Sequence, residues 1–443
     1  MDCLQFGKAG TKEGLALKSF FLFQRDCHGL SRGKQVLFWT WNVFWVLLSG
    51  LGLGVLSLLF AYGNYADGLF ATYFQNLWIA GLNVLPVVVL GLFLWLLVGR
   101  AWVSFLLNSL ITLGFSVANY FLLLFRDDPL MFEDLRYLRE AVGITKTAGY
   151  DISPDGRIWF GAICVAAGWA MLFFLVRGRS AAKVRLPMAV AAAAATMPFW
   201  HYYSDWSVYN TYTANYDYIN RWSSTQLYIS KGFVYPFLHS ITAGQIEEPE
   251  GYDEEAVEQL LSSYSDGEID TPVDLITVKL EAFAVLSEMG IEGVDFSLYD
   301  DYHAMEAEGV AGTLITNIFA GGTVDTERCF LTGLCTLPTF RSATNSYAWY
   351  FRTQGYTVEG SHPSYDWFYN RQNVNQYLGI SNYYFYENHY ADLSQAIAGD
   401  AILLPEILSL YEENRTDAPY FSFNVTYQGH GPYDTEEVWR GSH

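Results

Sequence analysis

The sequence has few cysteines and, in its second half, few basic residues. Residues 205–443 hold 9 Lys and Arg against 35 Asp and Glu, a net charge of −26 that exceeds the −21 of the whole chain. Nucleic acids bind basic surfaces, so this acidity argues against a nucleic-acid partner. Of the five cysteines, Cys329 and Cys335 are spaced so that they could bridge in an oxidising compartment, and two buried free thiols are the alternative.

Long apolar runs are abundant, and they gather in residues 36–200. A membrane-spanning helix needs roughly 20 mostly apolar residues. Five stretches meet or approach this length, the last being short and rich in alanine: Val36–Phe60, Leu77–Val98, Trp102–Leu124, Ile158–Val176 and Leu186–Trp200. We therefore expect a five-helix transmembrane bundle. Charges are almost absent from these runs, which favours a membrane anchor over a transporter.

Basic residues in the flanking loops predict the orientation of this bundle. They cluster before the first span and in the fourth connection, at Lys8, Lys12, Lys18, Arg25, Arg32, Lys34, Arg177, Arg179, Lys183 and Arg185. With five spans these loops fall on one side, which the positive-inside rule assigns to the cytoplasm. We expect a multi-pass membrane protein with a cytoplasmic N-terminus and an extracellular C-terminal domain.

The composition divides the chain into four predicted parts. These are a cytoplasmic tail (1–35), the transmembrane domain (36–204), a juxtamembrane linker rich in aromatic residues (205–250) and an outer domain (251–443).

The outer domain alternates between predicted strands and helices. The strands are Val273–Leu280, Gly312–Ile318, Tyr356–Gly360 and Tyr420–Tyr427, and the helices are Asp253–Tyr264, Tyr302–Glu308, Val324–Gly333, Ser342–Gln354 and Asp400–Tyr411. This alternation predicts an α/β domain with a mostly parallel sheet.

Two of the predicted strand ends carry residues suited to metal-assisted chemistry. Glu281 follows the first strand, where its carboxylate is a hard ligand for a divalent ion or merely a charge at a helix start. Thr323 follows Gly321-Gly322 and opens a helix that also carries Glu327. A hydroxyl there is a potential nucleophile if a metal ion lowers its pKa, and a simple helix N-cap otherwise.

Two further stretches carry residues that could bind a substrate. His430 lies in a glycine-flanked loop directly after the last strand, where it could donate a proton or have no role. Arg371 follows a run of aromatic residues that begins shortly after His362 and includes Tyr369. In a domain with so few cations, this Arg could bind phosphate or be an exposed helix residue.

These four stretches, in this order and behind five predicted spans, resemble the lipoteichoic acid synthase family within the sulfatase and alkaline phosphatase superfamily. The likeness covers nearly the whole chain and implies that the protein lies in a bacterial cell membrane. It rests on four segments: Leu280-Glu281-Ala282-Phe283, Gly322-Thr323-Val324-Asp325-Thr326-Glu327, Phe368-Tyr369-Asn370-Arg371 and His430-Gly431-Pro432-Tyr433. Tyr369 stands where the family usually has Trp, and Ala282 stands where it usually has Ser.

The resemblance implies a role for each of these residues. Thr323 would be the nucleophile that carries a phosphoglycerol ester, and Glu281 with Thr323 would hold a manganese-like ion, Mg²⁺ and Zn²⁺ being alternatives. His430, Arg371, Tyr369 and His362 would bind the headgroup. The implied reaction transfers phosphoglycerol from phosphatidylglycerol to a glycolipid or teichoic acid acceptor.

The sequence departs from the family at its C-terminus. The family's remaining metal ligands are an adjacent Asp-His pair beyond the His-Gly-Pro-Tyr segment, and this sequence ends at His443 without one. We therefore expect a domain that is incomplete at its C-terminus and inactive as it stands. The alternatives are a phosphoethanolamine transferase, a sulfatase or phosphodiesterase, and an inactive membrane-anchored fragment.

Overall fold

The computed structural model describes most of the chain between Ser31 and His430. The described residues are 31–65, 68–137, 153–176, 178, 182–211, 219–220, 223–243, 250–265, 267–283, 285–286, 295–312, 323–334, 337 and 339–430. The predicted strand Gly312–Ile318, apart from its first residue, and the segment Gly431-Pro432-Tyr433 lie outside them. Two compact units divide the chain: Met1–Gln245, here the membrane unit, and Ile246–His443, here the α/β unit.

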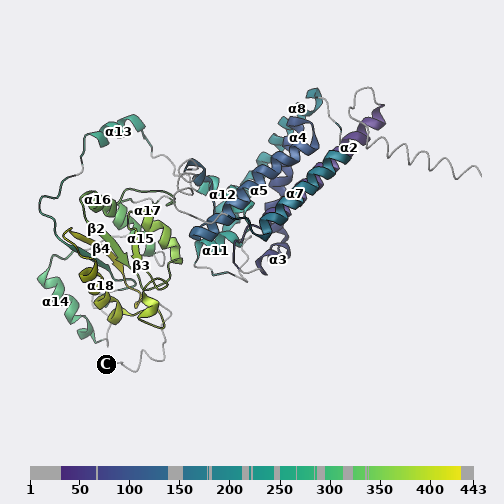
Figure 1. Ribbon diagram of the computed structural model, residues 1–443. Coiled ribbons are helices and arrows are strands. Elements are labelled where there is room, and N and C mark those ends of the chain that lie inside the picture. Colours follow the sequence, from purple (N-terminus) through teal and green to yellow (C-terminus); the bar gives the residue numbers. More distant parts are fainter. Residues whose placement is uncertain are drawn as a thin grey trace, which may run out of the picture. The chain divides into compact units, whose positions relative to one another are not determined.

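Four helices in the described part of the membrane unit are long and apolar enough to cross a membrane. They are α2 (Arg32–Leu58), α4 (Leu77–Val98), α5 (Ala101–Arg126) and α7 (Gly156–Leu175) (Figure 1). The Asn76 side chain caps the start of α4, and Gly99 ends it in the left-handed conformation with φ 78°. Their length and composition are those of a multi-pass membrane protein.

The helices pack closely because small residues lie at their contacts. A methyl group added to Gly50 or Gly54 of α2 would lie 2.8 or 2.9 Å from a backbone Cα atom of α4. Buried polar side chains add hydrogen bonds between α5 and α4, from Asn108 Nδ2 to the Val87 carbonyl (2.9 Å) and from Ser104 Oγ to the Gly91 carbonyl (2.7 Å). This combination is typical of helix association in lipid.

The predicted fifth span, Leu186–Trp200, is not one long α-helix. α8 (Ala182–Thr196) has 15 residues and is followed by the 3₁₀ turn η2 (Met197–Trp200) and by α9 (His201–Ser204). Pro198 at the start of η2 explains the break, because proline cannot donate the backbone hydrogen bond that continues an α-helix. α8 still packs on α4: buried Arg185 donates hydrogen bonds to the carbonyls of Leu96 and Leu97 in the last turn of α4.

Shorter helices complete the membrane unit. They are α3 (Gly68–Gln75), η1 (Phe132–Tyr137), α10 (Trp206–Thr211), α11 (Ser224–Ile229) and α12 (Val234–Ala243). Asn83 of α4 fixes the segment between α11 and α12. Its amide donates to the Lys231 carbonyl (2.7 Å), and its oxygen accepts from the backbone N–H groups of Phe233 (3.0 Å) and Tyr235 (3.1 Å). Much of the predicted linker is thus helical and packed.

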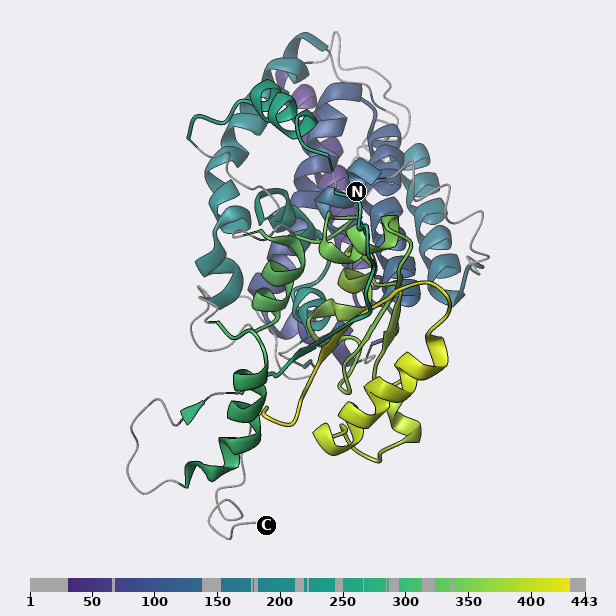
Figure 2. The same cartoon turned by 90° about the vertical axis from the view of Figure 1, so that its left-hand side faces the viewer.

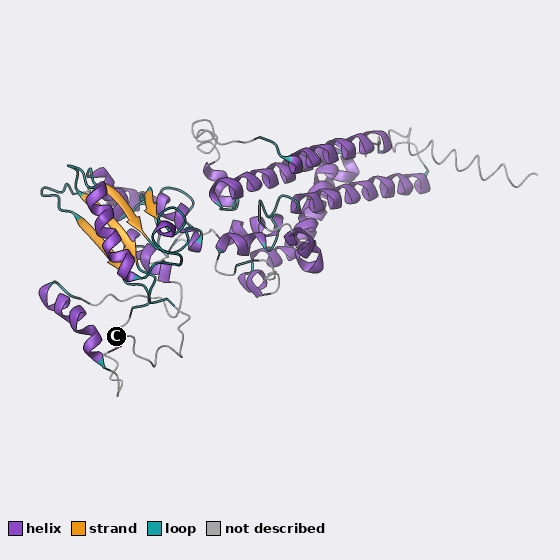
Figure 3. Cartoon of the chain, turned by 60° about the horizontal axis from the view of Figure 1, so that its bottom comes forward, coloured by secondary structure: helices purple, strands orange, loops and turns teal. Residues whose placement is uncertain are grey.

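The α/β unit is built on a four-stranded sheet in the order β1-β4-β2-β3 (Figure 3). The strands are β1 (Leu275–Lys279), β2 (Thr357–Ser361), β3 (Asn382–Tyr384) and β4 (Tyr420–Val425). All three pairings are parallel, so the predicted parallel sheet is confirmed. All six residues of β4 are buried, as expected for a central strand covered on both faces.

Helices cover both faces of this sheet. On one face, Phe330 of α15 (Thr323–Thr332) stacks on Phe423, and Phe351 of α16 (Tyr347–Thr353) stacks on Phe421. On the other, α18 (Asp400–Asn414) contacts β4 and β2 through Tyr411 against Tyr420 and Asn414 against Glu359. Figure 2 shows α18, in yellow, alongside the strands.

The remaining elements of the α/β unit are short. They are α13 (Glu254–Ser262), η4 (Phe296–Tyr299), α14 (Asp300–Glu308), η5 (Phe368–Asn370), α17 (Arg371–Tyr377) and η6 (Tyr390–Asp392). The sequence had predicted neither α17 nor the three-residue β3. Residues of α17 and β3 lie in one buried apolar cluster with β2 and β4, so tertiary packing stabilises these short elements.

Candidate active site

The candidate site lies where three parallel strands end. β1, β4 and β2 run side by side in register, with Lys279 opposite Val425 and Ser361 opposite Asn424. The residues that follow them, among them Glu281, Thr426 and His362, therefore emerge at one edge of the sheet. Ligands of open α/β sheets bind at this carboxyl edge.

Thr323 and Glu281, which are 42 positions apart in the sequence, are in direct contact. The Thr323 hydroxyl at the start of α15 donates a 2.7 Å hydrogen bond to Glu281 Oε1. Glu281 is only 4% exposed, and its backbone N–H donates to the buried Thr426 hydroxyl at 2.9 Å. Thr426, directly after β4, thus fixes the backbone of Glu281, and the Glu281 carboxylate in turn fixes the Thr323 hydroxyl.

Gly429 keeps the loop after β4 close to this pair. A methyl group at this position would lie 2.5 Å from the Glu281 carbonyl oxygen, a separation that no side chain tolerates. The next residue after Glu281, Ala282, has a positive φ of 55°. Both features indicate a tightly constrained turn around the carboxylate, because positive φ is costly for alanine.

A buried network of charges stands beside Thr323. Arg371, 2% exposed, donates two hydrogen bonds to Glu327, at 2.8 and 3.3 Å. Lys279 donates to the same carboxylate (2.9 Å) and to the Thr323 carbonyl (3.1 Å). Burial alone would raise the pKa of Glu327, but the two cations lower it to about 2. Arg371 also approaches Glu281 Oε2 at 3.5 Å.

His362 is a fully buried neutral ring whose tautomer follows from its partners. Its Nε2 lies 3.3 Å from Arg371 Nη1, which can only donate, so Nε2 accepts. Its Nδ1 must then carry the proton, and it lies 3.1 Å from the Val425 carbonyl. Burial and the nearby Arg371 charge lower the pKa of His362 to about 3. This ring therefore orients Arg371 and does not itself exchange protons near neutral pH.

Tyr369 and Asn370 hold a strained turn that presents Arg371. Both have φ of 57°, the left-handed region that residues other than glycine rarely adopt. Arg328 of α15 donates a 2.6 Å hydrogen bond to the Tyr369 carbonyl and stabilises this turn. The Arg371 guanidinium carbon lies 5.6 Å from the centre of the Tyr369 ring.

His430 is linked to these residues through aromatic rings. It stacks on Tyr427, with ring centres 4.9 Å apart, and meets Phe368 edge-on at 6.3 Å. Phe368 in turn lies 6.0 Å from the Arg371 guanidinium carbon. The structure thus brings Thr323, Glu281, Arg371 and His362 into one contact network, packs Tyr369 beside it and places His430 next to it.

Lys279 and Glu327 were not predicted as site residues, although Glu327 was placed on the helix that Thr323 opens. A signal for Lys279 was available: side chains two apart in a strand point the same way, and Lys279 is two residues before Glu281. The Cys329–Cys335 pairing stays a prediction, because Cys335 lies outside the described residues.

Two oxygen atoms of the site are of the kind that binds a divalent metal ion. Glu281 Oε2 is buried and makes no hydrogen bond, and Arg371 Nη2 is its ion-pair partner at 3.5 Å, so this oxygen keeps capacity for a further ligand. Thr323 supplies a second oxygen. Within the described residues no group of three His, Cys, Asp or Glu side chains is arranged to hold a metal ion, and a metal site at Glu281 and Thr323 stays a prediction.

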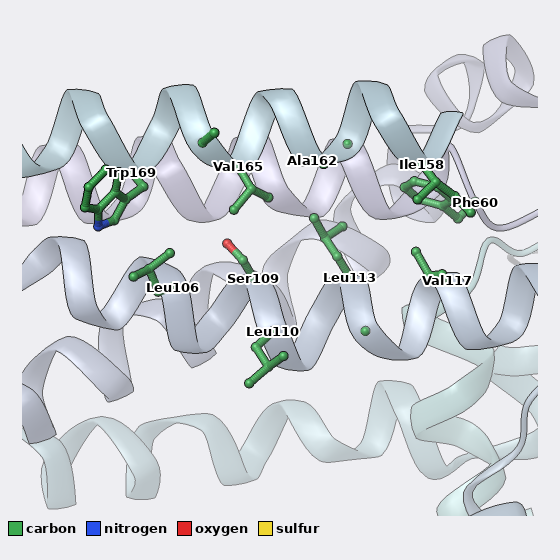
Figure 4. Close-up of a pocket in the computed structure, with 13 residues that line it drawn as sticks. Phe60, Leu106, Ser109, Leu110, Leu113, Val117, Ile158, Ala162, Val165 and Trp169 are labelled. Atoms are coloured by element: carbon green, nitrogen blue, oxygen red, sulfur yellow. The ribbon is translucent and has the colours of Figure 1, made fainter. Parts of the chain in front are cut away.

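A separate groove in the membrane unit has a different character. It lies between α5 and α7, has a volume of about 610 Å³ and is lined by apolar side chains and the Ser109 hydroxyl (Figure 4). Leu113 and Leu106 face Val165 and Trp169 across it. Such a lining suits lipid hydrocarbon and offers no charge to a phosphate, so the ionic chemistry belongs to the α/β unit.

Part of the α/β unit is similar in sequence to known proteins. Residues 292–442 match the Sulfatase family, a superfamily of hydrolases and phosphotransferases whose members usually bind a divalent metal. The chain is 28% identical over 226 residues to a protein of Rhizobium meliloti (strain 1021) named "Putative cyclic beta-1,2-glucan modification protein". The match covers 48% of this chain and 34% of that protein, so the chain spans about a third of its length.

No solved structure matches the chain significantly. The matched segment contains Thr323, His362, Tyr369, Arg371 and His430, while Glu281 precedes it. The matched residues 292–442 lie in the α/β unit, and their similarity to the Sulfatase family agrees with the predicted superfamily.

Proposed function

We propose that this protein transfers phosphoglycerol from phosphatidylglycerol to a saccharide-containing acceptor of the cell envelope through a phosphothreonine intermediate. The observation that carries the proposal is the 2.7 Å hydrogen bond from the Thr323 hydroxyl to Glu281, beside the buried Arg371. A nucleophilic hydroxyl, a carboxylate to take its proton and a fixed cation for phosphate are the groups that phosphoryl transfer needs.

In the first half-reaction, Thr323 Oγ1 attacks the phosphorus of the donor lipid. The bond from phosphorus to the diacylglycerol oxygen breaks, the Thr323 proton passes to Glu281, and His430 protonates the departing diacylglycerol. Arg371 is held rigid by Glu327 and His362, so its charge is already in place when negative charge develops on the phosphoryl oxygens.

In the second half-reaction, an acceptor hydroxyl attacks the same phosphorus. The bond between Thr323 Oγ1 and phosphorus breaks, His430 takes the acceptor proton, and Glu281 returns the proton to Thr323. A divalent ion held by Glu281 and Thr323, for which Mn²⁺ is our choice, would lower the pKa of the Thr323 hydroxyl. Two half-reactions at one threonine regenerate the free enzyme.

The membrane unit supports a donor that is itself a lipid. We infer that the N-terminus is cytoplasmic and the α/β unit lies outside, because the basic residues cluster in loops that five crossings place on one side. α8 and η2 together would extend about 30 Å, at about 1.5 Å per α-helical and 2.0 Å per 3₁₀ residue, with Lys183 and Arg185 at the cytoplasmic end of this fifth crossing.

The test measures diacylglycerol released from phosphatidylglycerol vesicles by the full-length gene product with Mn²⁺. We expect release by the wild type and none by Thr323→Ala, while Thr326→Ala, which removes a different hydroxyl from α15, keeps most of it. Release from phosphatidylethanolamine alone would show a phosphoethanolamine transferase instead. If metal-loaded protein releases diacylglycerol from neither lipid, the proposal is overturned and a binding protein is the remaining interpretation.

A further inference from the structure

A strip of aromatic rings lies on the loops that follow β2 and β3, and the proposed mechanism does not use it. We call Tyr365, Trp367 and Tyr386 the aromatic strip. Tyr365 and Trp367 stack with ring centres 5.4 Å apart and planes 16° from parallel, and Tyr386 meets Tyr365 edge-on at 5.3 Å. The strip thus presents ring faces and edges in one continuous group.

The strip is continuous with the candidate active site. Trp367 packs edge-on against Phe368 at 5.8 Å, and Phe368 contacts both His430 (6.3 Å) and the Arg371 guanidinium (6.0 Å). One buried ring therefore separates the strip from the residues proposed to bind the phosphoryl group. A molecule that rests on the strip can reach toward the reacting phosphorus.

The strip is accessible to solvent. Tyr365 is 36% exposed, and Trp367 and Tyr386 are half-buried, whereas Phe368 next to them is 9% exposed. Large rings left partly open to water lose hydrophobic stabilisation that full burial would provide. Such exposed and ordered rings beside a reactive site indicate a surface for a ligand.

Acidic groups beside the rings define the ligand's chemistry. The Asp366 backbone N–H donates to Glu387 Oε2 at 3.1 Å, so two carboxyl groups stand next to the strip. Burial raises the pKa of Glu387, and the neighbouring Asp366 raises it further. Carboxylates repel an anionic headgroup and accept hydrogen bonds from hydroxyl groups. Flat rings bordered by carboxylates match a neutral sugar, whose C–H faces pack on the rings.

We propose that the aromatic strip is the acceptor subsite and binds a neutral glucan chain so that one of its hydroxyl groups meets the phosphothreonine. The inference rests on the proposed function for the transfer step, but glucan binding itself does not depend on that step. The named activity of the Rhizobium meliloti relative, glucan modification, is in keeping with such an acceptor.

The first experiment measures binding without turnover. Full-length Thr323→Ala protein is titrated with cyclic β-1,2-glucan and followed by isothermal calorimetry. We expect binding that weakens by about tenfold or more in Trp367→Ala, as for loss of an aromatic anchor, and that is largely kept in Trp367→Phe. Tyr347→Ala, which removes a ring that is 53% exposed elsewhere in the α/β unit, should bind like the parent.

The second experiment separates this inference from the proposed function. In wild-type background, Trp367→Ala should lose the extra diacylglycerol release that added glucan causes, whereas Tyr347→Ala should keep it. Glucan binding without any diacylglycerol release would overturn the transferase and keep the strip. Absence of glucan binding, or equal binding by Trp367→Ala and Tyr347→Ala, would overturn the strip as a subsite.

Discussion

Glu327 is the anion between two cations of the candidate site. It pairs with both Arg371 and Lys279 where all three are largely removed from water, and it fixes the direction of the guanidinium. Buried ion pairs add little net stability, but losing one partner is costly because the remaining charge stays buried. Glu327 is therefore a positioning residue whose effect on phosphate binding passes through Arg371.

Glu327→Gln should destabilise the α/β unit strongly. The change keeps the shape but leaves two cations without their carboxylate, a loss of about 3 kcal/mol by the usual magnitude for a broken buried pair. Hydrogen exchange of β1 and β4 amides in the full-length protein would measure it. The matched control is Glu406→Gln, whose half-exposed partner is His389, and an equal small effect of both changes would contradict the prediction.

The same residue predicts a pH dependence. Its pKa is about 2 in the folded protein and near 4.5 ordinarily, so the unfolded chain takes up the proton first as the pH falls. The stability that Glu327 provides is complete above about pH 4.5 and is lost as the pH falls toward 2. The difference between wild type and Glu327→Gln should stay constant from pH 7 to 5 and shrink below that.

At the residue scale, the candidate reactive residues could be predicted from the sequence, but the residues that hold them in place could not. Thr323 and Glu281 were identifiable because each lies at an expected junction of strand and helix. The tautomer of His362 and the left-handed turn at Tyr369 depend on partners far away in the sequence, Val425 and Arg328. No local pattern encodes such partners.

The contact between α2 and α4 depends on which glycines face it. An alanine methyl at Gly54 would meet Val84 at 2.9 Å, whereas one at Gly52 would meet nothing within 4 Å. Gly54→Ala should therefore push the helices apart and cost about 1–3 kcal/mol, while Gly52→Ala should leave stability unchanged or raise it, because alanine favours helix.

Thermal unfolding of the two variants in detergent would test this directly. We expect a lower melting temperature for Gly54→Ala and an unchanged or higher one for Gly52→Ala. Equal shifts in both would show that helix propensity, and not contact with α4, decides the stability of α2.

At the element scale, strong periodic signals were predictive and short elements were not. The four long apolar runs and strands β1, β2 and β4 lie close to their predicted positions. The predicted fifth span ends as a 3₁₀ turn because Pro198 interrupts it. β3 has three residues, too few for an alternating pattern to be recognised.

At the scale of the whole molecule, the apolar composition of the first half and the acidic composition of the second half predicted two separate units. Long runs of uncharged apolar residues are typical of membrane-spanning helices. An acidic segment that alternates between strands and helices is typical of an α/β domain whose surface is in water. The alternation of strands and helices indicated the α/β class, and four motifs indicated the superfamily. Neither indicated the acceptor, because an acceptor is recognised by side chains that meet only after folding. Tyr365 and Tyr386, two members of the aromatic strip, come from the loops after two different strands, β2 and β3.

The central claim is that Thr323 carries the phosphoryl group between donor and acceptor. Peptide mass spectrometry of the full-length protein, quenched soon after mixing with phosphatidylglycerol and Mn²⁺ without acceptor, tests it most directly. We predict a phosphoglycerol ester on Thr323 that disappears when glucan is added. Diacylglycerol release with the ester on another residue, or with no ester at any time, would contradict the claim.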